Sequence, residues 1–175
     1  EGSDADVAAL GASTMVGPLL ALLVDVYLEQ AGLDEAELTA LRLHRIAAAQ
    51  PGPYLRAAAA FAQGRVCVAS GRGDARSYLH SALEGFARAQ LPMEVAQTKL
   101  ELAYASAERS PDVAIAEAKA ALEEFERLEA ARYADAAGAL LRSLGAPIRT
   151  GPKGVGALTR REAEVLQLIG AGLSN

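Results

Sequence analysis

One seven-residue pattern occurs twice in the second half of the sequence. The run from Ala82 to Arg88 (ALEGFAR) matches the run from Ala121 to Arg127 (ALEEFER), with an offset of 39 residues between positions 82 and 121. Both runs place apolar residues at helical spacing, so each predicts an amphipathic helix. A recurring helix of this kind buries its apolar face on a neighbouring repeat. The pattern therefore favours a fold built from stacked helices.

The rest of the sequence also divides into helix-length segments separated by glycine and proline. Asp34, Asp74 and Ser110 are predicted N-terminal caps, and Pro18 is predicted to occupy the first turn of a helix. No segment alternates in the manner of a β-strand, so we expect an all-α chain of antiparallel helical hairpins. After a frayed or weakly helical lead over residues 1–14, the expected helices span about residues 18–31, 34–49, 53–70, 75–89, 93–108, 111–128 and 130–144.

The apolar residues of the first two helices recur at helical spacing and are expected to be buried. In order they are Leu19, Leu22, Leu23, Val26 and Tyr27, then Leu38, Leu41 and Ile46. The single cysteine, Cys67, lies among apolar residues, which favours a buried structural thiol over a reactive one. A chain that can form no internal disulfide fits a reducing cytoplasm, so we expect a cytoplasmic protein.

The spacing of small and aromatic residues within the two runs resembles the second helix of a tetratricopeptide repeat. Alanine lets two helices approach closely, and phenylalanine fills the space beside it. The resemblance covers about residues 54–144, although the offset of 39 differs from the usual 34 of that family. A plain helical bundle is the alternative. The positions that carry the resemblance are Ala82, Phe86 and Ala89, and then Ala121, Phe125 and Leu128.

The resemblance to tetratricopeptide repeats implies a binding groove. In that family the first helix of each repeat lines the concave face, where a ligand or a partner protein would lie. Each polar residue on these helices could equally be ordinary surface. The candidate groove residues are Tyr54, Arg56, Gln63, Gln97 and Tyr104.

The last eighteen residues, 158–175, predict one further helix. Thr159 and Glu162 have the spacing of a capping box, which satisfies the backbone N–H groups at a helix start. The string LTRREAEVLQLIGAGLSN resembles the opening of the helix-turn-helix of LuxR-type regulators. The helix that reads DNA bases would follow Asn175 in that family. An apolar stripe at helical spacing is formed by Ala163, Leu166 and Ile169.

The LuxR resemblance implies a bacterial transcription regulator similar to the large maltose-regulator type, in which a nucleotide-binding domain often precedes helical repeats. We expect the sequence to be a piece of such a protein, with a repeat domain over residues 1–145 and a Pro/Gly linker over residues 146–157. DNA would be bound through the complete helix-turn-helix and not by this fragment alone. The residues expected near DNA phosphates are Thr159, Arg160 and Arg161.

Charge is unevenly distributed along the sequence. The net charge is −5, but from Arg142 to Arg161 there are five basic residues and no acidic one. A cationic segment beside a DNA reader would lower the cost of approaching phosphates. The alternative is a solvated linker with incidental arginines. A protein-interaction scaffold without DNA binding is therefore kept as a second hypothesis for the whole chain.

Enzyme, cofactor, metal and membrane functions are not expected. The glycine-rich run from Gly151 to Gly156 lacks the phosphate-loop pattern, and His44 and His80 have no second ligand at metal-binding spacing. The apolar stretch between Asp6 and Asp25 is interrupted by Gly and Pro and lacks basic flanks, which argues against a membrane span or a signal peptide. We expect an effector or protein partner at the repeats, and a homodimer is left open.

Overall fold

The computed structural model describes the backbone of residues 3–49 and 52–146, and the side chains of these ranges from Val16 onward. Residues 147–175, which hold most of the expected linker and the expected start of the helix-turn-helix with Thr159, Arg160 and Arg161, lie outside the described residues. The predictions for that segment stay predictions.

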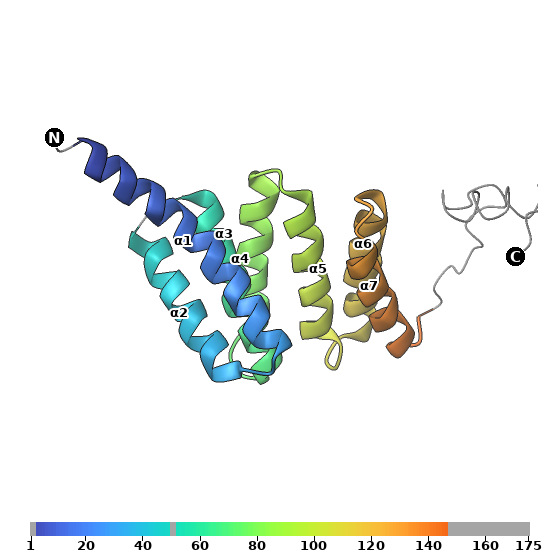
Figure 1. Cartoon of the computed structure of the whole chain (residues 1–175). Helices are drawn as coiled ribbons and strands as arrows, with labels where there is room; N and C mark the ends of the chain where they lie inside the picture. Colours follow the sequence, from blue (N-terminus) through green and yellow to red (C-terminus); the bar gives the residue numbers. More distant parts are fainter. Residues whose placement is uncertain (1–2, 50–51, 147–175) are drawn as a thin grey trace, which may run out of the picture.

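The described residues form seven helices and no strand, so the predicted all-α fold is confirmed (Figure 1). Two of the predicted starts agree closely with the structure: α3 begins at Pro53, and the backbone N–H of Ser77 donates to Oδ1 of the cap Asp74 over 3.1 Å. The helices are α1 (Ser3–Glu29), α2 (Leu33–Ala49), α3 (Pro53–Ser70), α4 (Ala75–Arg88), α5 (Pro92–Ser106), α6 (Pro111–Arg127) and α7 (Ala131–Ser143).

The starts of α1 and α2 differ from the sequence prediction. Pro18 lies inside α1 instead of in its first turn. An interior proline costs a helix about 3 kcal/mol, and burial of Leu20 and Val24 just after it offsets that cost. α2 begins at Leu33, so Asp34 sits in the first turn and not at the cap. A carboxylate is favourable there because the N-terminal end of a helix is electropositive.

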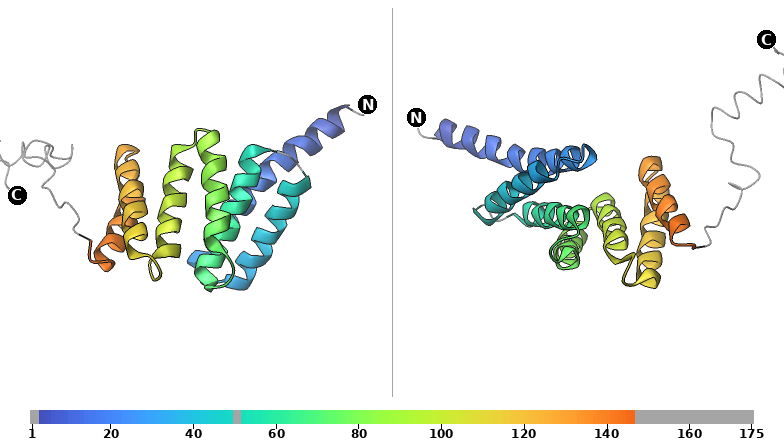
Figure 2. Two further views of the ribbon diagram at one scale, coloured as in Figure 1. Left: turned by 180° about the vertical axis from the view of Figure 1, so that it is seen from behind. Right: turned by 90° about the horizontal axis from the view of Figure 1, so that it is seen from below.

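The helices pack in the order expected for stacked hairpins. Consecutive helices contact each other, and so do the odd-numbered neighbours α1 and α3, α3 and α5, and α5 and α7. Among the described residues, no Cα atom of one even-numbered helix lies within 8 Å of a Cα atom of another. Figure 2 shows the helices following one another along the molecule from α1 to α7. The odd-numbered helices therefore form one continuous layer. None of the described helices combines the length and the apolar composition that crossing a membrane requires.

The repeated runs supply the core of the second and third hairpins. Ala82 and Phe86 are buried in α4, and Ala121 and Phe125 are buried in α6. The two phenylalanines belong to separate apolar clusters, one around α3 and α4 and one around α5, α6 and α7. The prediction that the repeated pattern buries its apolar face is confirmed at these four positions.

The predicted apolar faces of α1 and α2 were largely wrong. The exposed fraction is 58% for Leu19, 59% for Leu22 and 69% for Leu38. Both helices carry apolar residues on more than one side, and contact with α3 selects the side that is buried. α1 packs through Leu20 and Val24, and α2 packs through its small residues and Leu43. The other exposed members of the predicted set are Leu23, Val26 and Leu41.

Replacing Gly85 with alanine is expected to lower the free energy of unfolding by roughly 1–3 kcal/mol, the usual cost of overpacking. An added Cβ would lie 2.6 Å from Cβ of Ala57, so α3 and α4 would have to separate. Urea unfolding followed by circular dichroism measures the change. Gly138→Ala in α7 is the matched control, because its Cβ would meet only the flexible end of Arg142 at 3.4 Å. We expect that variant to be neutral or slightly stabilised, and equal destabilisation of both would contradict the α3–α4 packing.

Candidate functional site

The four odd-numbered helices enclose a hollow of about 80 Å³, which we call the inner pocket. Its polar lining consists of three carboxylates and two guanidinium groups, together with the amide of Gln97. Phe61, Leu100 and Tyr133 supply the apolar part. The charged lining residues are Asp25 and Glu29 from α1, Arg65 from α3, Glu101 from α5 and Arg132 from α7.

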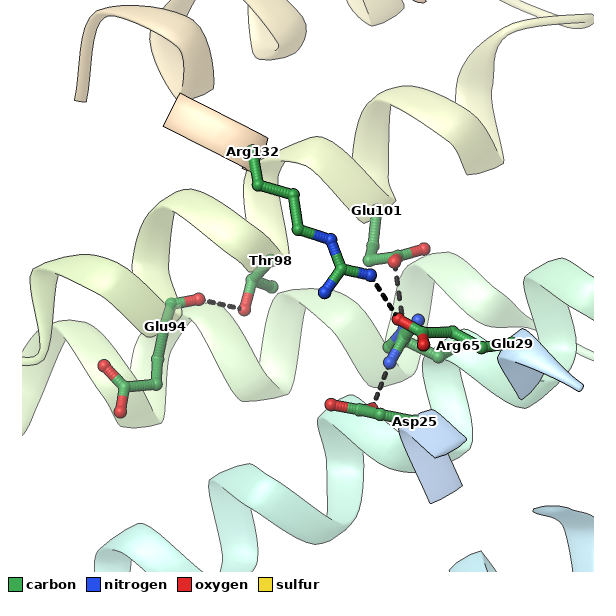
Figure 3. Close-up of polar contacts among 7 residues, drawn as sticks. All are labelled: Asp25, Glu29, Arg65, Glu94, Thr98, Glu101 and Arg132. Atoms are coloured by element: carbon green, nitrogen blue, oxygen red, sulfur yellow. Dashed lines mark hydrogen bonds and ion pairs between the residues drawn. The ribbon is translucent and has the colours of Figure 1, made fainter. Parts of the chain in front are cut away.

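Arg65 is the centre of this charged group (Figure 3). Its Nε donates to Oε1 of Glu101 over 3.0 Å, and its Nη1 donates to Oδ1 of Asp25. The guanidinium carbon also lies 5.9 Å from the centre of the Phe61 ring, within the range of a cation–π contact. The side chain of Arg65 is 21% exposed and that of Glu101 is 17% exposed. A single, partly buried arginine thus joins α1, α3 and α5.

A second ion pair joins the first and last described helices. Nη2 of Arg132 in α7 donates to Oε1 of Glu29 in α1 over 2.6 Å, although 103 residues separate the two in the sequence. Both side chains are largely exposed, at 79% and 60%. The pair lies at the rim of the inner pocket, because both residues also line it.

Burial dominates the titration of the two inner carboxylates. It raises the pKa of Glu101 and of Asp25 above their ordinary values, although the charge and the hydrogen bond of Arg65 act in the opposite direction. With all five groups ionised, the lining carries one negative charge in excess. Arg65 therefore compensates the two carboxylates only in part.

A larger open hollow of about 690 Å³ lies between α4, α5 and α6. Its ion pair joins Glu124 and Arg127, which are one turn apart on the same helix, with Nη2 of Arg127 2.5 Å from Oε1 of Glu124. The hydrogen bond from Arg127 lowers the pKa of Glu124. Local pairs of this type are common on solvated helix surfaces. The inner pocket is the better candidate site because its charged groups come from four different helices.

Of the five residues that the sequence suggested for a groove, Gln97 lines the inner pocket. Tyr54 instead packs against Phe86, with 6.1 Å between ring centres. Arg56 lines two other hollows, one between α3 and α4 and one between α2, α3 and α4. Ser81 of α4 lines both of them.

The remaining two candidates also lie outside the inner pocket. Tyr104 borders a separate depression near the ends of α3 and α5, close to Cys67, and burial raises its pKa. Gln63 is partly buried in α3. Cys67 itself is partly buried and its thiol pKa is raised, chiefly by burial, which fits the predicted unreactive thiol. The groove assignments stay predictions, with Gln97 as the member that the inner pocket includes.

The sequence prediction missed the charged lining. Arg65 is the one charged residue between Arg56 and Arg72, and Asp25 is the one charged residue between Asp6 and Glu29. An isolated charge inside an otherwise apolar helix needs a partner, since an unpaired buried charge is costly. Two isolated charges of opposite sign on neighbouring hairpins were therefore an available signal for this site.

The inner pocket is suited to recognition by charge and hydrogen bonding. Its groups can accept and donate hydrogen bonds, and they come from four different helices. Thr98, on the same helix as Gln97, does not line the pocket; it is fully buried, and its hydroxyl donates to the carbonyl of Glu94 over 2.7 Å. Among the described residues, no three His, Cys, Asp or Glu side chains are arranged to hold a metal ion.

The chain was compared with protein families, with curated proteins and with solved structures, and none of the three comparisons gave a match.

Proposed function

We propose that residues 1–145 are the regulatory module of a LuxR-type DNA-binding transcription regulator, and that the inner pocket is where this module senses an effector or a partner protein. The observation that carries the proposal is the convergence of charged side chains from four helices on one pocket. A ligand bound there would contact α1 and α7 at once. It would therefore favour one arrangement of the helices over another by its differential contacts.

We propose the connection from the pocket to DNA because the segment that resembles the DNA reader follows α7 in the sequence. α7 ends at Ser143, and the segment that resembles the LuxR-type helix follows from residue 158. A change in the position of α7 would alter where that segment begins. This gives a physical route by which ligand binding at the repeats could control the DNA reader.

A protein-interaction scaffold without DNA binding is the alternative. The exposed leucines of α1 and α2 favour it, because large apolar side chains left on a surface are available for contacts with another protein. The scaffold hypothesis predicts binding to a protein and no retention of DNA.

We expect a chain extended through the complete helix-turn-helix to retain a few genomic DNA fragments selectively in a gel-retardation assay. Retention should weaken as salt concentration rises, because counterions are released from the phosphates on binding. Replacing Arg160 and Arg161 with alanine should weaken binding to all fragments and reduce the salt dependence. Arg72→Ala, in the loop after α3, is the control and should bind as the parent does.

Two results would contradict these expectations, and the first would decide against the regulator. The first is a well-folded extended chain that shows no sequence-dependent retention at any salt concentration. A second result, specific operator binding by residues 1–175 alone, would instead refute the expectation that this fragment does not bind DNA by itself, because the base-reading helix is expected beyond Asn175. The first result would favour the scaffold and direct attention to protein partners.

A further inference from the structure

The first and last described helices are joined only through side chains. Among the described residues, no Cα atom of α1 lies within 8 Å of a Cα atom of α7. The ion pair between Glu29 and Arg132 nevertheless spans the space between them, as Figure 3 shows. The chain between these two residues runs through five other helices. The separation of α1 and α7 is therefore not fixed by direct packing.

The inner pocket is too small for a ligand as it stands. Its volume is about 80 Å³, whereas pockets that bind small molecules usually enclose about 300–1,000 Å³. A water molecule occupies about 30 Å³ in the liquid. The pocket thus has room for a few waters. Any larger ligand can enter only if helices that line it move apart.

The two ion-pair systems of the pocket differ in how firmly they hold. Arg65 and Glu101 are 21% and 17% exposed, and Arg65 also packs on Phe61. They hold α3 to α5, which also contact each other directly. Glu29 and Arg132 are 60% and 79% exposed. An exposed pair of this kind changes a population by about fivefold or less and is weakened by salt.

A weak closure has a consequence for sensing. Two states that differ by a few-fold in population can be interconverted by a ligand with modest preference for one of them. A strong closure would require a ligand with an equally strong preference for the open state. The exposed pair at the rim has the properties of a reversible closure, and the partly buried contacts between Arg65 and Glu101 have those of a fixed support.

We propose that the Glu29–Arg132 pair is a latch over the inner pocket. With the latch formed, α1 and α7 are held together and the pocket is closed. With the latch broken, the two helices separate and the pocket becomes large enough to admit a ligand. The role of the opened pocket in sensing rests on the proposed function, but the opening itself requires neither a ligand nor DNA.

The latch is tested by measuring the distance between α1 and α7 with spin labels. Leu22→Cys and Ala139→Cys place the labels on exposed positions of the two helices, in a chain whose one native cysteine is removed by Cys67→Ala. We expect a short, narrow distance distribution at low salt. Concentrated NaCl should shift that distribution to longer and broader distances.

Variants separate the latch from general effects of charge. Arg132→Ala should shift the distribution toward longer and broader distances even at low salt, with a change of up to about fivefold in the ratio of the two populations. The double exchange of Glu29→Arg with Arg132→Glu should restore the short distance, because it rebuilds the pair with reversed charges. Arg72→Ala is the matched control, since it removes a comparable exposed pair with Glu37, 2.9 Å, elsewhere in the chain. The control should leave the distribution unchanged.

The proposal is overturned if neither concentrated NaCl nor Arg132→Ala changes the distance. It is also overturned if the double exchange leaves the helices as far apart as Arg132→Ala does. The salt measurement uses the parent side chains at the latch, so it decides the question even if a variant folds poorly. Opening in a protein whose extended chain retains no DNA would support the latch and refute the regulator, which keeps the two proposals distinct.

Discussion

Phe125→Ala is expected to lower the free energy of unfolding by about 3–5 kcal/mol, the usual range for removing a buried aromatic side chain. Phe125 is fully buried in α6 and stacks on Tyr133 of α7, with 5.3 Å between ring centres. Much of its surroundings is alanine, including Ala96 and Ala118, which is too short to fill the space left behind. The measurement is urea unfolding followed by the helical circular-dichroism signal.

The matched control is Tyr78→Ala, which removes an aromatic side chain that is 40% exposed on α4. Surface substitutions usually change stability by about 0.5 kcal/mol or less, so we expect a much smaller effect than for Phe125. Equal effects of the two substitutions would mean that Phe125 is not the centre of the α6–α7 packing. If the urea transition of Phe125→Ala is also less cooperative than that of Tyr78→Ala, α7 detaches before the other helices.

The burial of Phe125 could be predicted from the sequence because the same apolar pattern occurs twice, with a phenylalanine at the same place in each copy. The run around Phe86 and the run around Phe125 have the same spacing, and both phenylalanines are buried. Helix boundaries were likewise accessible where proline or a capping side chain marks them, as at Pro53 and Asp74. These signals are local, and a linear sequence carries them directly.

The buried faces of α1 and α2 could not be predicted in the same way. Leu19 and Leu20 are equally apolar, yet the first is 58% exposed and the second 7%. The choice between them depends on where α3 lies. Periodicity identifies an apolar helix but does not choose among several apolar sides.

The inner pocket shows the same limit more strongly. Arg65 meets partners that are 36 and 40 residues away, and Arg132 meets one that is 103 residues away. Gln97 is a predicted groove residue and lines the inner pocket, but this does not test the predicted groove. The charged lining could not be predicted, since the pairing of these residues depends on how α1, α3, α5 and α7 stack.

Arg65→Met is expected to lower the free energy of unfolding by about 2–3 kcal/mol at neutral pH. Methionine keeps much of the length of the side chain and removes its charge, so Asp25 and Glu101 lose their shared partner. Breaking a buried ion pair usually costs about 3–5 kcal/mol. The smaller value applies here because Asp25 is 41% exposed and water screens part of its charge.

The cost of Arg65→Met should depend on pH in a defined direction. Burial already raises the pKa of Asp25 and Glu101, and loss of Arg65 removes the charge and hydrogen bond that oppose this rise. A carboxyl whose pKa is higher in the folded state contributes stability at low pH and loses it as pH rises from its ordinary value to the raised one. The ordinary values are 3.8 and 4.5. The variant should therefore be closest to the parent in acid.

Unfolding in urea at about pH 4.5 and about pH 7.5 measures this difference, with the larger loss expected at the higher pH. Adding Asp25→Asn and Glu101→Gln to Arg65→Met should recover most of the loss at neutral pH, because no uncompensated carboxylate then remains at these positions. The same two amide substitutions without Arg65→Met are the control for the amides themselves. A loss that is independent of pH and persists in the triple variant would mean that Arg65 stabilises the helices through its packing on Phe61, and that charge pairing in the inner pocket contributes little to the fold.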